Sequence, residues 1–146
     1  MRYDTEMKVS RYKNCRNEQD FKRTWANNNK LFWKKIFCIE TEETIAGFPD
    51  VMLLDMDNRV YFLEFKIADK NGRFKFQSTQ PAFYRQNKDL PISVIVLDKT
   101  KESYIHFKPQ YLFDGNLLSP KATVLTEQVL SYIKYHNLFD ENEKWF

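Results

Sequence analysis

One segment constrains the fold more than any other: Ile92–Leu97 is almost wholly apolar and contains four β-branched residues. A strand of this composition has no polar face, so we expect it to be buried on both sides. A sheet with two buried faces needs further layers of structure packed against each face. The segment therefore predicts a protein of the α/β class.

The flanking sequence supplies helices and strands in the order helix, three strands, helix, strands, helix. Helices are expected over residues 17–28 with Asn17 as N-cap, over 77–88, and after Ser119-Pro120, where Leu125, Val129 and Ile133 have helical spacing. Pro81 fits only a first turn, so the second helix should begin near Ser78–Gln80. Strands are expected over 31–40, 51–54, 60–67 and 104–107. A chain of 146 residues is the length of a single domain.

Composition excludes several classes of protein. With 42% hydrophobic and 29% charged residues, the chain is not intrinsically disordered. No apolar run reaches the roughly 18 residues of a membrane-spanning helix, and the N-terminus lacks the apolar core of a signal peptide. A cytoplasmic protein with no membrane partner is therefore expected. Two cysteines and two histidines without metal-ligand spacing argue against a structural zinc site.

The net charge of +3 is unevenly distributed along the chain. Residues 1–38 carry ten basic and four acidic side chains, and residues 69–91 carry five and two. Between them, residues 39–68 carry two basic and seven acidic side chains. This pattern has two explanations: an ordinary solvated surface, or a platform for a polyanion around an acidic, metal-binding centre.

The strand expected at 60–67 contains two charged residues in an otherwise apolar sequence. Alternation puts Tyr61, Leu63, Phe65 and Ile67 on one face and Phe62, Glu64 and Lys66 on the other. Burying a carboxylate and an ammonium costs desolvation energy. One explanation is structural: an edge strand with one wet face and a cross-strand ion pair.

Asp50 offers a second explanation. It follows Pro49 at the start of the preceding strand, where a hairpin could bring it beside Glu64. Two adjacent carboxylates repel each other unless a cation lies between them, and hard oxygen ligands suit Mg²⁺. Lys66 could then polarise a phosphate or hold an attacking water. This is the chemistry of phosphodiester hydrolysis.

The register of that hairpin decides whether the carboxylates meet. A two-residue Asp57-Asn58 turn would set Asp50 opposite Phe65, pointing away from Glu64. A three-residue turn would set Asp50 opposite Lys66, with a positive φ at Asn58 or Arg59, and a bulge in either strand would serve equally. We therefore predict an irregular or odd-length hairpin that brings the two carboxylates within reach of one metal ion.

The segments Pro49-Asp50 and Glu64-Phe65-Lys66 resemble the two parts of the motif of the PD-(D/E)xK nuclease superfamily. The similarity is closer to the standalone VRR-NUC branch, common in phages, and to Holliday-junction resolvases. As in that branch, a glycine (Gly47) precedes the motif, and a charged loop containing Gly72 follows it. Gln80 matches the family glutamine of the next helix, whereas Gln77 stands where serine is usual. The resemblance covers roughly residues 17–98.

The resemblance implies a restriction-endonuclease-like core, with a mixed central β-sheet flanked by helices in the order αβββαβ. The core would span about 17–98 of one nuclease domain, 1–146, with 99–146 as a C-terminal extension. The implied activity is that of an endodeoxyribonuclease, with Mg²⁺ as cofactor and Mn²⁺ able to replace it. Its implied partner is DNA with branches such as a four-way junction, in the cytoplasm of a phage-infected or other prokaryotic cell.

The resemblance also assigns roles to individual residues. Asp50, Glu64 and the carbonyl of Phe65 would hold the metal, and Lys66 and Gln80 would be catalytic. A glutamate of the first helix would help hold the metal; Glu18 is the best candidate, with Glu40, Glu42 and Glu43 as alternatives. Lys70, Arg73, Lys75, Arg85 and Tyr84 would contact DNA, although a solvated face or helix packing would also explain them.

The sequence leaves alternatives open for the activity of the protein and for the role of its apolar C-terminal residues. The protein could instead be a nucleic-acid-binding protein that keeps the nuclease fold without turnover, or a nuclease acting on RNA or single strands. A homodimer is expected, because a junction has two symmetric scissile phosphates. Its interface would use apolar residues of the C-terminal third, which could alternatively cover the sheet: Leu125, Val129, Ile133, Phe139, Trp145 and Phe146.

Overall fold

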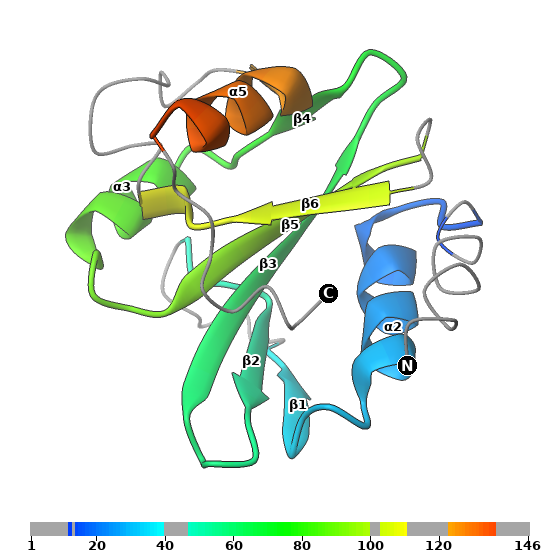
Figure 1. Ribbon diagram of the computed structural model, residues 1–146, viewed down its shortest axis with the longest axis vertical. Helices are drawn as coiled ribbons and strands as arrows, with labels where there is room; N and C mark the ends of the chain where they lie inside the picture. Colours follow the sequence, from blue (N-terminus) through cyan, green and yellow to red (C-terminus); the bar gives the residue numbers. More distant parts are fainter. Residues whose placement is uncertain (1–11, 13, 40–46, 100–102, 111–122, 137–146) are drawn as a thin grey trace.

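The computed structural model describes residues 12, 14–39, 47–99, 103–110 and 123–136, and its centre is a five-stranded sheet (Figure 1). The strands are β1 (Lys35–Cys38), β2 (Val51–Leu54), β3 (Val60–Ala68), β5 (Ile92–Asp98) and β6 (Ser103–Phe107), in the order β1-β2-β3-β5-β6. Only β3 and β5 run parallel; the other neighbours are antiparallel. The expected α/β class with a mixed central sheet flanked by helices is confirmed.

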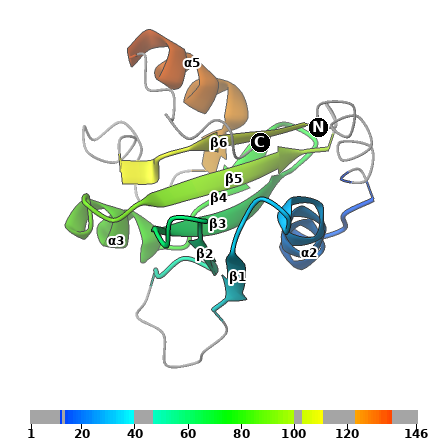
Figure 2. The ribbon, with the colours of Figure 1, turned by 60° about the horizontal axis from the view of Figure 1, so that its bottom comes forward.

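Layers of structure cover both faces of this sheet (Figures 1 and 2). Helix α2 (Glu18–Asn29) lies on one face, where its Phe21 and Trp25 pack with Phe65 of β3. The other face holds α3 (Gln80–Gln86), α5 (Thr126–His136) and a small sheet of β4 (Arg73–Lys75) with β7 (Thr123–Leu125). Alternate residues of β5 enter the two cores, which explains why Ile92–Leu97 has no polar face.

Strand β3 lies inside the sheet, between β2 and β5. Glu64 and Lys66 lie beyond the end of the β2 pairing but are buried, so the explanation that they occupy a wet face is wrong. The expected division of its faces is confirmed, because Leu63 and Phe65 join the core under α2 whereas Phe62 packs against the core under α3. Glu64 and Lys66 share the face of Phe62 by alternation, and both are buried.

Most expected elements are present, with local differences in their ends. Asn17 caps α2 as expected, because its side-chain oxygen accepts a hydrogen bond from the Asp20 backbone N–H at 2.8 Å. The strand expected at 31–40 is shorter, since the chain first turns, with the Phe32 N–H donating to the carbonyl of Asn29. Leu125 belongs to β7, and α5 begins at Thr126 rather than further upstream; Ser119-Pro120 lies outside the described residues.

Of the C-terminal residues expected at a dimer interface, the structure describes the side chains of Leu125 and Val129. Val129 is buried in the core of its own chain, so its assignment to an interface is wrong and it covers the sheet instead. Leu125 pairs with Arg73 in the small sheet. The side chain of Ile133 and residues Phe139, Trp145 and Phe146 lie outside the described part. None of the described helices is long and apolar enough to cross a membrane.

Candidate active site

The connection between β2 and β3 sets the register on which the site depends. Val51 pairs with Leu63 and Leu54 with Val60, so five residues, 55–59, join the strands. The next step of this register sets Asp50 opposite Glu64, on the same face of the hairpin. The expected odd-length connection is thus confirmed, but it contains five residues rather than three, and Asp50 faces Glu64 rather than Lys66.

Asp55 shapes this connection. Its Oδ1 accepts hydrogen bonds from the backbone N–H groups of Asp57 and Arg59, both at 2.8 Å, and its own N–H donates to the Arg59 carbonyl at 3.0 Å. Asn58 takes the positive φ, 63°, as expected for asparagine in this position. The side chain of Asp55 therefore stabilises a longer turn than the Asp57-Asn58 pair alone suggests.

Asp50 lies where β2 and β3 stop pairing. Its Oδ2 accepts a hydrogen bond from the Phe65 N–H at 3.4 Å, a donor that would otherwise face a strand partner. The N–H and C=O of one residue point to the same edge of a strand, so the Phe65 carbonyl faces this side as well. The end of β2 thus brings a carboxylate and a backbone carbonyl together beside Glu64.

Gly47 fixes the path by which the chain enters β2. Its φ is 88°, and a Cβ at this position would lie 2.8 Å from both the Cβ of Phe83 and the carbonyl oxygen of Thr79. Only glycine tolerates both the backbone angle and this close approach to the start of α3. Gly47 therefore packs the Pro49-Asp50 segment against the helix that carries Gln80.

Glu64, Lys66 and Gln80 form a buried cluster, each with less than 5% of its surface exposed. The Nζ of Lys66 donates to Gln80 Oε1 at 3.0 Å and lies 3.7 Å from Glu64 Oε2. The backbone N–H of Gln77 also donates to Gln80 Oε1, at 2.8 Å, so that oxygen is held between two donors. Residue 77 contributes only its backbone to this contact.

Burial and a neighbouring carboxylate both disfavour the charged form of Glu64. Burial raises the pKa of Glu64 to about 8, with a further upward contribution from Asp50, while Lys66 and Gln80 lower it. Its Oε1 is buried and accepts no hydrogen bond from the described residues. A cation bound between Glu64 and Asp50 would compensate for both the burial and the repulsion.

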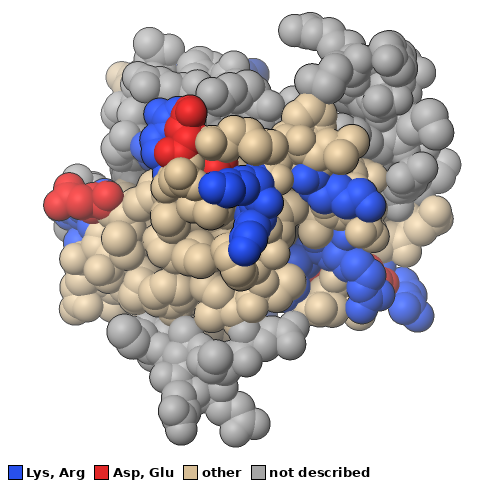
Figure 3. Space-filling model, turned by 90° about the horizontal axis from the view of Figure 1, so that it is seen from below, with Lys and Arg blue, Asp and Glu red and all other residues tan. Residues whose placement is uncertain are grey.

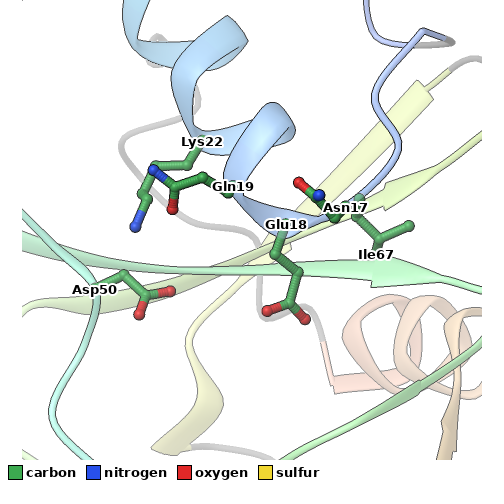
Figure 4. Close-up of a pocket in the computed structure, with 6 residues that line it drawn as sticks. All are labelled: Asn17, Glu18, Gln19, Lys22, Asp50 and Ile67. Atoms are coloured by element: carbon green, nitrogen blue, oxygen red, sulfur yellow. The ribbon is translucent and has the colours of Figure 1, made fainter.

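An open pocket of about 480 Å³ lies beside Asp50, and the residues that line it are Asn17, Glu18, Gln19, Lys22, Asp50 and Ile67. Figure 4 shows the carboxylates of Glu18, from α2, and Asp50, from the start of β2, entering the same space. Burial raises the pKa of Glu18, Lys66 lowers it and Asp50 raises it, so all three groups are within electrostatic range. The structure thus brings Glu18 to the site, whereas Glu40, Glu42 and Glu43 lie outside the described residues.

The described residues contain no group of three or more His, Cys, Asp or Glu side chains placed to hold a metal ion by themselves. Asp50 and Glu64 with the Phe65 carbonyl nevertheless form a donor set of hard oxygen atoms, and one of these atoms, Glu64 Oε1, lacks any hydrogen bond from the described chain. Mg²⁺ commonly binds one or two carboxylates and completes its shell with water or phosphate oxygens. The residues present therefore fit this ion.

The expected DNA contacts divide into two groups. Lys70, Arg73 and Lys75 are exposed around the β3–β4 turn, and Arg85 is half-buried in α3. Asp69 orders the turn by accepting the N–H groups of Asn71 and Arg73 at 2.8 and 3.0 Å. Figure 3 shows several Lys and Arg side chains on the face of the molecule seen from below.

Tyr84 belongs to the interior, and its assignment as a DNA contact is wrong, because none of its surface is exposed. Burial raises the pKa of its hydroxyl far above the usual range, and the Glu64 and Asp50 carboxylates raise it further. Its ring packs against that of Phe76, with centroids 5.8 Å apart. Tyr84 thus supports the inner side of the site instead of meeting a ligand at the surface.

Lys22 and Gln19 line the pocket but were not assigned to the site by the sequence interpretation. Lys22 lies one helical turn after Glu18 on α2 and is buried. The spacing in the sequence could have identified Lys22, because residues four apart on a helix share a face and Glu18 was already a candidate.

Comparison of the chain with protein-family models, with curated proteins and with solved structures finds no match.

Proposed function

We propose that this protein is a metal-dependent nuclease of the PD-(D/E)xK superfamily, with a restriction-endonuclease-like core, that hydrolyses phosphodiester bonds in DNA. The observation that carries the proposal is the placement of Asp50 opposite Glu64, with Lys66 3.7 Å from Glu64, at the point where β2 and β3 part. The burial of Glu64 and Lys66 is costly for stability alone, which supports a chemical role.

Asp50, Glu64 and the Phe65 carbonyl would hold Mg²⁺, or Mn²⁺ in its place, with Glu18 close enough to assist. When bound, such an ion polarises a phosphate oxygen and lowers the pKa of a coordinated water. Glu64 would bind the ion as a carboxylate, so its proton would leave when the ion binds. Gln80 fixes the Lys66 ammonium at 3.0 Å, where it can orient water and stabilise negative charge that develops on the phosphate.

The choice of substrate rests on the resemblance to Holliday-junction resolvases. We propose branched DNA, such as a four-way junction, as the preferred substrate. A junction presents two symmetric scissile phosphates, so we also propose that the protein acts as a homodimer. Sedimentation at micromolar concentration tests the dimer; a monomer that still cleaves junctions would contradict it.

The experiment is a cleavage assay with four labelled substrates: a four-way DNA junction, duplex DNA, single-stranded DNA and single-stranded RNA. Each is incubated with the protein in Mg²⁺, in Mn²⁺ or in EDTA. We expect metal-dependent cleavage with the junction cleaved fastest. Faster cleavage of RNA or single-stranded DNA would mean that the preferred substrate is not a junction, while the proposed phosphodiester hydrolysis would stand. Binding without cleavage under every condition would favour a nuclease fold without turnover and contradict the proposal.

A further inference from the structure

Lys22 has a largely buried side chain whose ammonium group the mechanism above does not use. Only 9% of the residue's surface is exposed, although it is a lysine on the outer layer of the fold. Among the described residues, no carboxylate oxygen lies within 4.0 Å of its Nζ and no hydrogen bond to it is present. Figure 4 shows the ammonium at the end of the side chain directed into the pocket that also contains Asp50.

The Nζ of Lys22 is not among the buried side-chain atoms that lack a hydrogen-bond partner, so the pocket leaves the ammonium accessible. The stem of the side chain can pack against apolar neighbours, but this leaves the charged end to be satisfied from the pocket. Glu18 lies within electrostatic range of Lys22, but no ion pair joins the ammonium to a carboxylate of the described residues. An anion that enters the pocket would supply the missing partner directly.

The pocket has two chemically different sides. Glu18 and Asp50 contribute carboxylates on one side, whereas Lys22 and the side-chain amide of Gln19 contribute hydrogen-bond donors from α2 on the other (Figure 4). The first turn of α2 also adds the partial positive charge of a helix N-terminus. A cation and an anion can therefore occupy neighbouring parts of one pocket.

We propose that Lys22 and Gln19 form a binding subsite for a second phosphate group of the substrate strand, next to the phosphodiester held at Asp50 and Glu64. This inference rests on the proposed function, since it assigns the pocket to a polynucleotide. The subsite would fix the position of the strand relative to the reacting phosphate, so Lys22 is a positioning residue. It reads no base, because a phosphate carries no sequence information.

The test compares Lys22→Met with Lys30→Met, the same change at an exposed lysine at the end of α2. Affinity for a fluorescent four-way DNA junction is measured in EDTA at several salt concentrations. We expect Lys22→Met to bind about tenfold or more weakly, the loss of one charge-assisted hydrogen bond. The slope of log affinity against log salt should fall by about 0.7 to 0.9, the value for one phosphate contact. Lys22→Arg and Lys30→Met should remain near wild type.

Thermal unfolding without DNA separates this role from a structural one. Lys22→Met keeps the apolar stem and removes the charge, so its melting temperature should equal or exceed that of the wild type. A marked drop, with unchanged affinity and salt slope, would make Lys22 a structural counter-charge and overturn the inference. If the wild type cleaves DNA while Lys22→Met keeps its affinity and slope, only the inference falls. If no nucleic acid is cleaved but Lys22→Met loses affinity and slope, the subsite stands and the nuclease proposal falls.

Discussion

Asp50 Oδ2 accepts a hydrogen bond from the backbone N–H of Phe65, with the two atoms 3.4 Å apart. A side-chain carboxylate thus occupies the place where a strand would continue the ladder. The contact fixes Asp50 relative to Glu64, the residue just before Phe65, without any ligand. The site therefore forms where β2 ends. Its chemistry depends on the length of the β2–β3 connection, because this length decides whether Asp50 lies opposite Glu64.

Lys66→Ala should separate catalysis from binding. Because Lys66 contacts Gln80 and Glu64 and does not belong to the oxygen donor set, its removal should lower the cleavage rate by on the order of 10²-fold or more while DNA affinity stays close to wild type. Single-turnover cleavage and equilibrium binding on the same substrate check this. Wild-type cleavage by Lys66→Ala would rule out its catalytic role.

The raised pKa of Glu64 predicts a pH-dependent stability. The folded protein holds the Glu64 proton up to a pKa of about 8, whereas the unfolded chain releases it near the ordinary glutamate pKa of 4.5. The free energy of unfolding in EDTA should therefore decrease as pH rises between these values. Glu64→Gln should lose this contribution and be more stable than wild type at pH 8. Urea unfolding at pH 5 and pH 8 measures it; an identical pH dependence in both proteins would contradict the burial of a protonated Glu64.

Gly47→Ala should destabilise the protein more than Gly72→Ala. Both glycines have a positive φ, but the added Cβ would meet a backbone oxygen and Phe83 at position 47 and only the hydroxyl of Thr126 at position 72. We expect a loss of about 1–3 kcal/mol for Gly47→Ala and a smaller loss for Gly72→Ala. Urea denaturation of the two variants decides this. Equal losses of unfolding free energy in the two variants would show that the close approach of Gly47 to α3 does not contribute to stability.

Gln80→Ala should weaken cleavage through Lys66. Gln80 Oε1 links the Lys66 ammonium to the backbone of Gln77, so its loss leaves the ammonium free to reorient. We expect a lower kcat, by about tenfold, with KM nearly unchanged and an altered pH profile. Gln86→Ala, at the exposed end of the same helix, is the control. A pure change in KM would place Gln80 in substrate binding instead.

The sequence alone predicts the parts of this fold that depend on local pattern. Alternation along β3 correctly places Leu63 and Phe65 on one face of the strand and Phe62 on the other. The requirement that Asp50 lie beside Glu64 correctly predicts a β2–β3 connection with an odd number of residues. The exact length was missed, because the two backbone hydrogen bonds accepted by Asp55 create a five-residue turn that residue types do not reveal.

Features that depend on distant contacts were not predictable in this way. Strands β4 and β7 have three residues each, and their pairing joins segments about fifty positions apart. The burial of Tyr84 arises from packing between α3 and the central sheet, which places a polar aromatic residue inside rather than on the surface. The position of Lys22 in the same pocket as Asp50 likewise depends on how α2 packs against the sheet, so the local sequence pattern did not predict it.

The most direct test of the account is metal-dependent cleavage of a labelled four-way DNA junction by wild type, Asp50→Asn and Asp57→Asn. Asp57 provides a matched change on the same hairpin, since it is exposed and pairs only with Arg59 among the described residues. We predict cleavage in Mg²⁺ by wild type and Asp57→Asn, and none by Asp50→Asn or in EDTA. Cleavage by Asp50→Asn at the wild-type rate would contradict the assignment of the active site.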